Sequence, residues 1–97
     1  MPTYVTLLNW TETGIGSFKG APERTKEAAA LLEKMGGRLK DVYWTLGPYD
    51  VVSVIEAPDD ETLMAFQLAI GARGNVRSTT LRALNADEFQ SVVDKAP

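Results

Sequence analysis

Four stretches of the chain combine apolar residues on alternating positions with the residue types that favour β-strands. Val, Ile, Thr, Tyr and Trp are concentrated in them, and Gly, Pro or Asn lies at most of their ends. We therefore predict strands at Thr3–Trp10, Arg38–Leu46, Asp50–Ala57 and Val76–Leu84.

Between these stretches, apolar residues recur every three or four positions, which indicates helices. We predict one helix from Pro22 to Met35, because proline suits a first turn and Gly36-Gly37 can end the helix. A second helix is expected from Asp60 to about Ile70, with Asp59 as its N-cap. A short terminal helix should follow Asn85, which can cap it.

The connections complete the predicted order of elements. Three glycines in Thr11–Gly20 indicate a loop, Gly47-Pro48 indicates a tight turn between two strands, and Gly71–Asn75 indicates another turn. The order β-α-β-β-α-β is that of the ferredoxin-like α+β fold with a four-stranded antiparallel sheet. A chain of 97 residues suits one domain, so we take 1–97 as a single unit.

In such a fold the helices cover one face of the sheet and leave the other face bare. Strand Arg38–Leu46 places Trp44 on one side and Tyr43 on the other, and strand Asp50–Ala57 has valines on both sides. Both faces are therefore apolar, which is typical of a sheet that packs against a partner. We predict a homodimer or a larger homo-oligomer that associates through its sheets.

Composition excludes several classes of function. A net charge of -3 with ten scattered Lys and Arg residues argues against a nucleic-acid partner. We expect no membrane span and no signal peptide, because no apolar run is long enough and no basic segment precedes the first one. The absence of cysteine suits a cytoplasmic protein, and with histidine also absent we expect neither a metal nor a cofactor.

Tyr49 and Asp50 follow the predicted turn and allow two interpretations. In the structural one, the Asp50 carboxylate accepts hydrogen bonds from turn amides while Tyr49 packs beside it. In the chemical one, Asp50 is a general base beside a phenol in a cleft. We favour the structural interpretation, and the catalytic residues remain unassigned.

Further candidates for ligand binding lie near the strand ends. Asn9 and Trp10 end the first strand and point to opposite faces, and Tyr43 or Trp44 is expected to reach a cavity. Arg77 lies in Gly71–Arg77, a segment that suits either an anion-binding nest or a turn into an edge strand.

Four short motifs in order resemble the GYD domain family of small bacterial and archaeal proteins. They are Asn9-Trp10-Thr11, Gly47-Pro48-Tyr49-Asp50, Glu56–Glu61, and Gly74–Arg77 running into Thr80–Ala83. Together they span about four fifths of the chain. Pro48 separates the glycine from the Tyr-Asp pair, so the pattern here is Gly-x-Tyr-Asp.

The resemblance implies a dimeric α/β barrel, in which two sheets pack face to face around a shared cavity. Proteins of that architecture include oxygenases without metal or cofactor, chlorite dismutases that bind haem, and amino-acid-sensing regulator domains. Fold analogy alone transfers none of these activities. We therefore expect a small-molecule binding or assembly module that uses the cavity between paired sheets. The alternative is a cofactor-independent oxygenase or isomerase that acts on a small aromatic or carbonyl compound.

Overall fold

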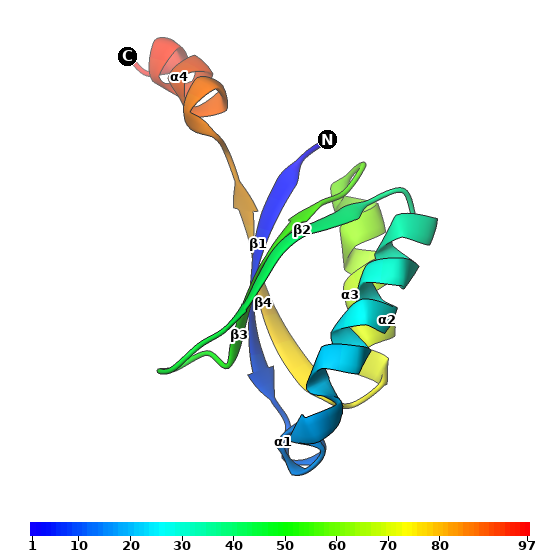
Figure 1. Ribbon diagram of the computed structural model, residues 1–97. Helices are drawn as coiled ribbons and strands as arrows, with labels where there is room; N and C mark the ends of the chain where they lie inside the picture. The colour runs from blue at the N-terminus through cyan, green and yellow to red at the C-terminus, as the bar shows by residue number, and fades with distance from the viewer.

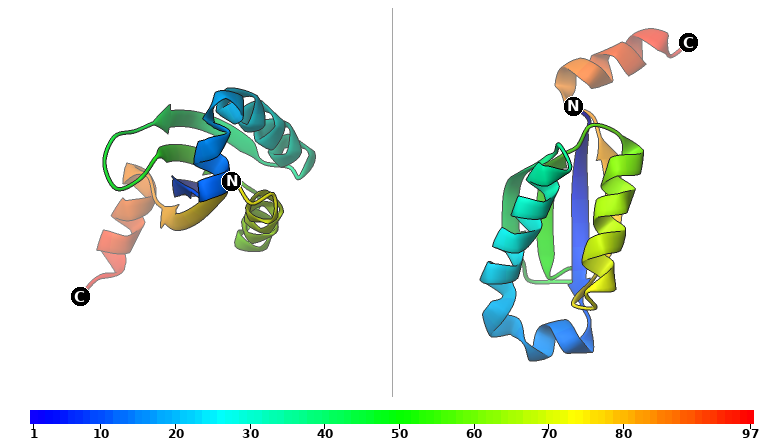
Figure 2. Two further views of the ribbon diagram at one scale, coloured as in Figure 1. Left: turned by 90° about the horizontal axis from the view of Figure 1, so that it is seen from below. Right: turned by 90° about the vertical axis from the view of Figure 1, so that its right-hand side faces the viewer.

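The computed structural model describes residues 1–97 and has the predicted α+β ferredoxin-like fold. The four strands pair antiparallel in the order β2-β3-β1-β4, and the two longest helices, α2 and α3, cover one face of the sheet (Figures 1 and 2). The elements in chain order are β1 (Thr3–Trp10), α1 (Glu12–Gly16), the 3-10 helix η1 (Phe18–Gly20), α2 (Ala21–Lys34), β2 (Arg38–Trp44), β3 (Val51–Glu56), α3 (Asp60–Ala72), β4 (Val76–Ala83) and α4 (Ala86–Lys95).

The predicted antiparallel hairpin between β2 and β3 forms, but its connection is longer than the tight turn expected at Gly47-Pro48. Strand β2 ends at Trp44 and β3 begins at Val51, so residues 45–50 form a longer loop that projects from the sheet (Figure 1). A hydrogen bond of 2.9 Å from the Thr45 N–H to the Asp50 carbonyl closes this loop. Gly47 has a φ of 107°, a conformation that a side chain disfavours, so the chain does reverse at this glycine.

The predicted loop at Thr11–Gly20 is wrong, because α1 and η1 form there. The Thr11 hydroxyl caps α1 by accepting a hydrogen bond from the Gly14 N–H at 3.1 Å. The Thr11 N–H donates to the Asn75 carbonyl at 3.1 Å, which ties α1 to the turn before β4. A Cβ on Gly14 would lie 1.9 Å from that carbonyl oxygen. The glycine therefore permits close packing of α1 and does not indicate the loop that we predicted from it.

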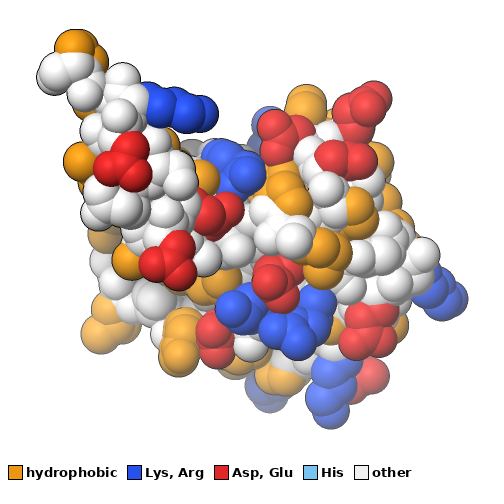
Figure 3. Space-filling view, turned by 90° about the horizontal axis from the view of Figure 1, so that it is seen from above, with side chains coloured by type: hydrophobic (Ala, Val, Ile, Leu, Met, Phe, Trp, Pro, Cys, Tyr) orange, Lys and Arg blue, Asp and Glu red, His pale blue; other side chains and the backbone are white.

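The terminal helix α4 begins as predicted after Asn85, and Asn85 and Glu88 form a complete capping box. Figure 3 shows that α4 stands apart from the rest of the molecule. Phe89, Val92 and Val93 share one side of this helix, and each is about half exposed. The apolar side of α4 therefore has no cover within the chain.

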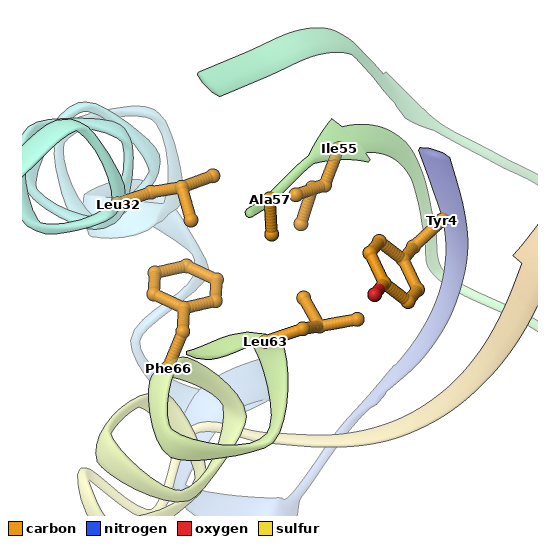
Figure 4. Packing of buried hydrophobic residues seen from close by; sticks show 6 residues of the cluster. All are labelled: Tyr4, Leu32, Ile55, Ala57, Leu63 and Phe66. Carbon is orange, nitrogen blue, oxygen red and sulfur yellow. The ribbon is translucent and has the colours of Figure 1, made fainter. Parts of the chain in front are cut away.

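The core lies between the helices and one end of the sheet (Figure 4). Residues at alternating positions of the central strands point toward the helices, with Tyr4 of β1 beside Ile55 of β3. Burial, with the hydrogen bond that the Tyr4 hydroxyl donates to the Asp60 carboxylate, raises the pKa of Tyr4 to about 12. The complete buried cluster is Tyr4, Leu32, Ile55, Ala57, Leu63 and Phe66.

The two glycines of α1 provide a matched test of this packing. Gly14→Ala should lower the free energy of unfolding by about 1–3 kcal/mol, because the new Cβ meets the Asn75 carbonyl. Gly16→Ala should be neutral or stabilising by up to about 1 kcal/mol, because no atom lies within 4 Å of the site and alanine favours helix. Denaturant unfolding measures both values. Equal values for the two variants would contradict the docking of α1 on the turn.

Candidate functional site

A cavity of about 600 Å³ lies between the sheet and helices α2 and α3. It borders the core at Ile55 and Phe66 and extends toward Trp10, beside the first half of α2 and along α3. The residues that line it from α2 include Ala21, Thr25 and Ala28, and α3 contributes Gly71. Because the side chains of α2 at this point are small, they leave space between that helix and the sheet.

The walls of the cavity are mainly apolar, with 15 hydrophobic residues among 25. Both tryptophans of the chain line it, Trp10 from β1 and Trp44 from β2. Thr6 and Ser53 lie side by side on the sheet, where both are buried and their hydroxyls share a hydrogen bond. This pair satisfies its own polar atoms, so it leaves no buried group that requires a ligand.

Three arginines, Arg24, Arg73 and Arg77, are the only charged residues in the lining, and no Asp or Glu accompanies them. The Arg24 guanidinium donates to the Ser17 carbonyl at 2.9 Å and the Gly14 carbonyl at 3.4 Å, so it also holds α1 against α2. The ion pairs of the chain involve Lys26, Arg38 and Arg82 instead. The cavity is therefore locally basic in a chain whose net charge is -3.

The structure divides the predicted ligand-binding residues between two faces of the sheet. Trp10 and Trp44 line the cavity on the helix side. Arg77 also borders the cavity, but the strand register pairs it with Asn9, on the face away from the helices. Tyr43 lies beside Val52 on that same opposite face and is 60% exposed.

Asn9 has a structural partner on this opposite face. Its side-chain amide donates to the Pro48 carbonyl at 2.7 Å. The contact joins the end of β1 to the loop of residues 45–50, so the amide is already engaged within the chain.

Tyr49 and Asp50 do not line the cavity. The Asp50 carboxylate accepts a hydrogen bond from the Trp10 N–H at 2.9 Å, and the Asp50 N–H donates to the Leu8 carbonyl at 2.9 Å. We expected the carboxylate to bind amides of the turn, and instead it binds the backbone of the neighbouring strand. The Tyr49 carbonyl accepts from the Thr45 hydroxyl at 2.6 Å.

Sequence reasoning missed Arg24, Thr6 and Ser53. Arg24 lies on the same side of α2 as Ala21 and Ala28. Helical spacing alone therefore places a charged residue on a side of the helix that is otherwise small and apolar, and this signal could have identified it as a site residue. Thr6 and Ser53 gave no such signal, because hydroxyls in strands are ordinary.

Two observations concern other kinds of site. No three acidic residues come together at a spacing that suits a metal ion. None of the helices has the length and apolar character needed to span a bilayer.

Comparison with known proteins gives a family and a fold. The model of the GYD domain family matches residues 4–93. A curated protein of Thermus thermophilus, "Glutamine synthetase and cystathionine beta-lyase binding protein", is 40% identical over 85 residues, which cover 87% of this chain and 90% of that protein.

Two solved structures are similar in fold. TTHA0845 from Thermus thermophilus has a TM-score of 0.57 at 24% identity, over 89% of this chain and 96% of that one. MtbAldR has a TM-score of 0.69 at 18% identity, over 87% of this chain, which spans only 52% of the length of MtbAldR. At these identities the two likenesses show the fold alone.

Removal of the Asp50 carboxylate tests its structural role. Asp50→Ala should lower the free energy of unfolding by about 1–3 kcal/mol, because the Trp10 N–H loses its acceptor. Asp50→Asn should cost less, since its carbonyl oxygen can still accept that bond. Glu27→Ala is the control, because Glu27 is exposed on α2 and forms no ion pair, and it should change stability by less than about 0.5 kcal/mol. Equal unfolding midpoints for the two alanine variants would show that Asp50 has no such role.

Proposed function

We propose a binding and assembly function for this chain, which belongs to the GYD domain family. In this proposal the protein pairs with a second copy of itself and the pair binds partner enzymes. The main support for enzyme partners is the relative at 40% identity, whose name describes a protein that binds glutamine synthetase and cystathionine β-lyase. The cytoplasmic location predicted from the sequence stays a prediction and is part of this proposal.

The observation that carries the pairing is the character of the sheet face away from the helices, which we call the free face. Its centre is apolar, and the strand register places these residues in adjacent rows. The row through Val5 contains Val54 and Leu81, and the next row contains Leu7 and Val52. All five side chains are half-buried or exposed in the single chain.

Polar residues surround this apolar centre. Arg38 and Glu56 form an ion pair of 3.2 Å toward one end of the sheet, and Asn9 lies opposite Arg77 toward the other. An apolar centre with a polar rim is the usual composition of a protein interface. A second copy can cover the face by two-fold symmetry, because such an interface needs one self-complementary patch.

Helix α4 adds to the surface that a second copy would meet. It leaves the sheet on the side away from α2 and α3 (Figures 1 and 2). A copy packed on the free face therefore lies on the same side as the exposed Phe89, Val92 and Val93. Burial of apolar area is worth about 25 cal/mol per Å², so covering this helix and the free face together favours the pair.

The predicted shared cavity between two paired sheets remains part of this proposal. The cavity within the single chain lies on the other side of the sheet, against the helices. The two spaces are distinct. The helix-side cavity is formed by one chain, whereas the shared cavity requires two.

The alternative of a cofactor-independent oxygenase or isomerase has less support. It needs Asn9, Trp10, Tyr49 and Asp50 around one substrate in the cavity between paired sheets, whereas Trp10 lies on the helix side of the sheet and Asn9 on the free face. The Asp50 carboxylate, the base in that mechanism, already accepts the Trp10 N–H.

Charge on the free face tests the pairing. At micromolar concentration the chain should sediment with the mass of at least two copies. Val54→Lys should shift it to a monomer, because the ammonium group would be buried at the centre of the apolar patch. Ala30→Lys is the control, since Ala30 is exposed on α2, and it should leave the mass unchanged. Sedimentation of the parent chain as a folded monomer would contradict the pairing.

Direct binding to enzymes tests the second part of the proposal. The purified chain should retain glutamine synthetase or cystathionine β-lyase from the same organism in surface-bound titrations, and Val54→Lys should bind more weakly if the pair presents the contact surface. An unrelated metabolic enzyme of similar size is the control. Binding to neither named enzyme, with the parent chain confirmed as a folded oligomer, would overturn the assignment of these partners and leave the pairing intact.

A further inference from the structure

We propose that the cavity between the sheet and helices α2 and α3 binds a small carboxylate with an aromatic or hydrocarbon body. This site lies within one chain and is separate from the free face, so the proposal does not depend on pairing or on enzyme binding. It rests on the shape of the cavity, the apolar character of its walls and the sign of its charges.

The size and shape of the cavity indicate a ligand site. The cavity is an open pocket, because Trp44 in its wall is 46% exposed. A volume of about 600 Å³ lies within the range of small-molecule pockets, which is about 300–1,000 Å³. The cavity also reaches the surface beside Met64 and Leu68 of α3, which are 63% and 73% exposed, so a ligand can enter.

The walls favour an apolar body. Trp10 and Trp44 supply aromatic surface from two strands, and Leu8, Val51 and Ile70 add aliphatic surface. Thr6 and Ser53 bond to each other, so this part of the wall makes no strong demand for a polar ligand atom. An aromatic ring or a short hydrocarbon chain would gain from burial against such walls.

The charges favour an anion. Arg24 and Arg73 line the cavity, and no Asp or Glu lines it beside them. Arg73 lies just after the end of α3, and its side chain forms no ion pair within the chain. Arginine binds carboxylates through paired N–H groups, which gives these residues a specific ligand group to hold. A carboxylate at this basic rim, with its apolar body directed inward, satisfies both features.

Binding can be measured with three probes of different shape, each compared with its neutral amide. The probes are phenylacetate, 2-naphthoate and decanoate. Because both tryptophans of the chain line the cavity, their two indole N–H signals in ¹H–¹⁵N spectra report occupancy. We expect at least one carboxylate to bind saturably, one per chain, and about tenfold more tightly than its amide, the usual worth of a hydrogen bond to a charged group.

Substitutions locate the site. Ala28→Leu fills the cavity and should abolish binding while the fold is kept, whereas Ala30→Leu on the exposed side of the same helix should have no effect. Arg73→Gln should weaken the carboxylate about tenfold and leave the amide unchanged. Lys34→Gln removes the same unit of charge from an exposed position of α2 and is the control. Thr25→Leu replaces Ala28→Leu if circular dichroism shows that the latter is unfolded.

The proposal is overturned if none of the three carboxylates binds saturably, or if each binds no better than its amide. It is also overturned if the folded Ala28→Leu or Thr25→Leu variant binds as the parent chain does, because binding would then lie elsewhere. All of these measurements use the purified chain alone, so their failure says nothing against the partners proposed above.

Discussion

The pairing of β1 with both β3 and β4 is the constraint on which the other features of this structure depend. Because side chains alternate along a strand, this register sends Tyr4 and Thr6 to the helices and Val5 and Leu7 to the free face. A shift by one residue would exchange the two sets and bury the wrong face. The same register thus places the core and the cavity on one side of the sheet and the proposed pairing surface on the other.

Local sequence signals predicted most of the secondary structure. Strand β1 has the predicted bounds, and the caps Asp59 and Asn85 bind the N–H groups of Thr62 and Glu88 as expected. The failures came where tertiary contacts decided local structure. Gly14 of α1 permits a close approach to the Asn75 carbonyl, and sequence patterns record the glycine but not the carbonyl that it faces.

The candidate site was less predictable for a related reason. Aromatic residues at strand ends made Trp10 and Trp44 candidates for the cavity between paired sheets, and in the structure they line the separate cavity within one chain. The cavity lies on the helix side because α2 and α3 leave space above the sheet. The distance between each helix and the sheet is set by packing and cannot be derived from the sequence of either helix. Asp50 was a candidate base because it follows Tyr49 after a turn, and its contact with the Trp10 N–H depends on a strand pairing between residues 40 positions apart.

The hollow end of the domain and its bare surfaces have a common physical consequence. Eleven of 97 residues are buried, and the cavity removes close packing from one end of the space between the helices and the sheet. A helix as short as α4 is marginal in isolation, even with its capping box, unless its apolar side is covered. A second copy and a cavity ligand each bind only the native state, and each therefore stabilises it by mass action in proportion to its affinity and concentration. The stability of this fold thus depends on what binds to each side of the sheet. A second copy stabilises it through the free face, and a ligand stabilises it through the cavity on the helix side of the same four strands.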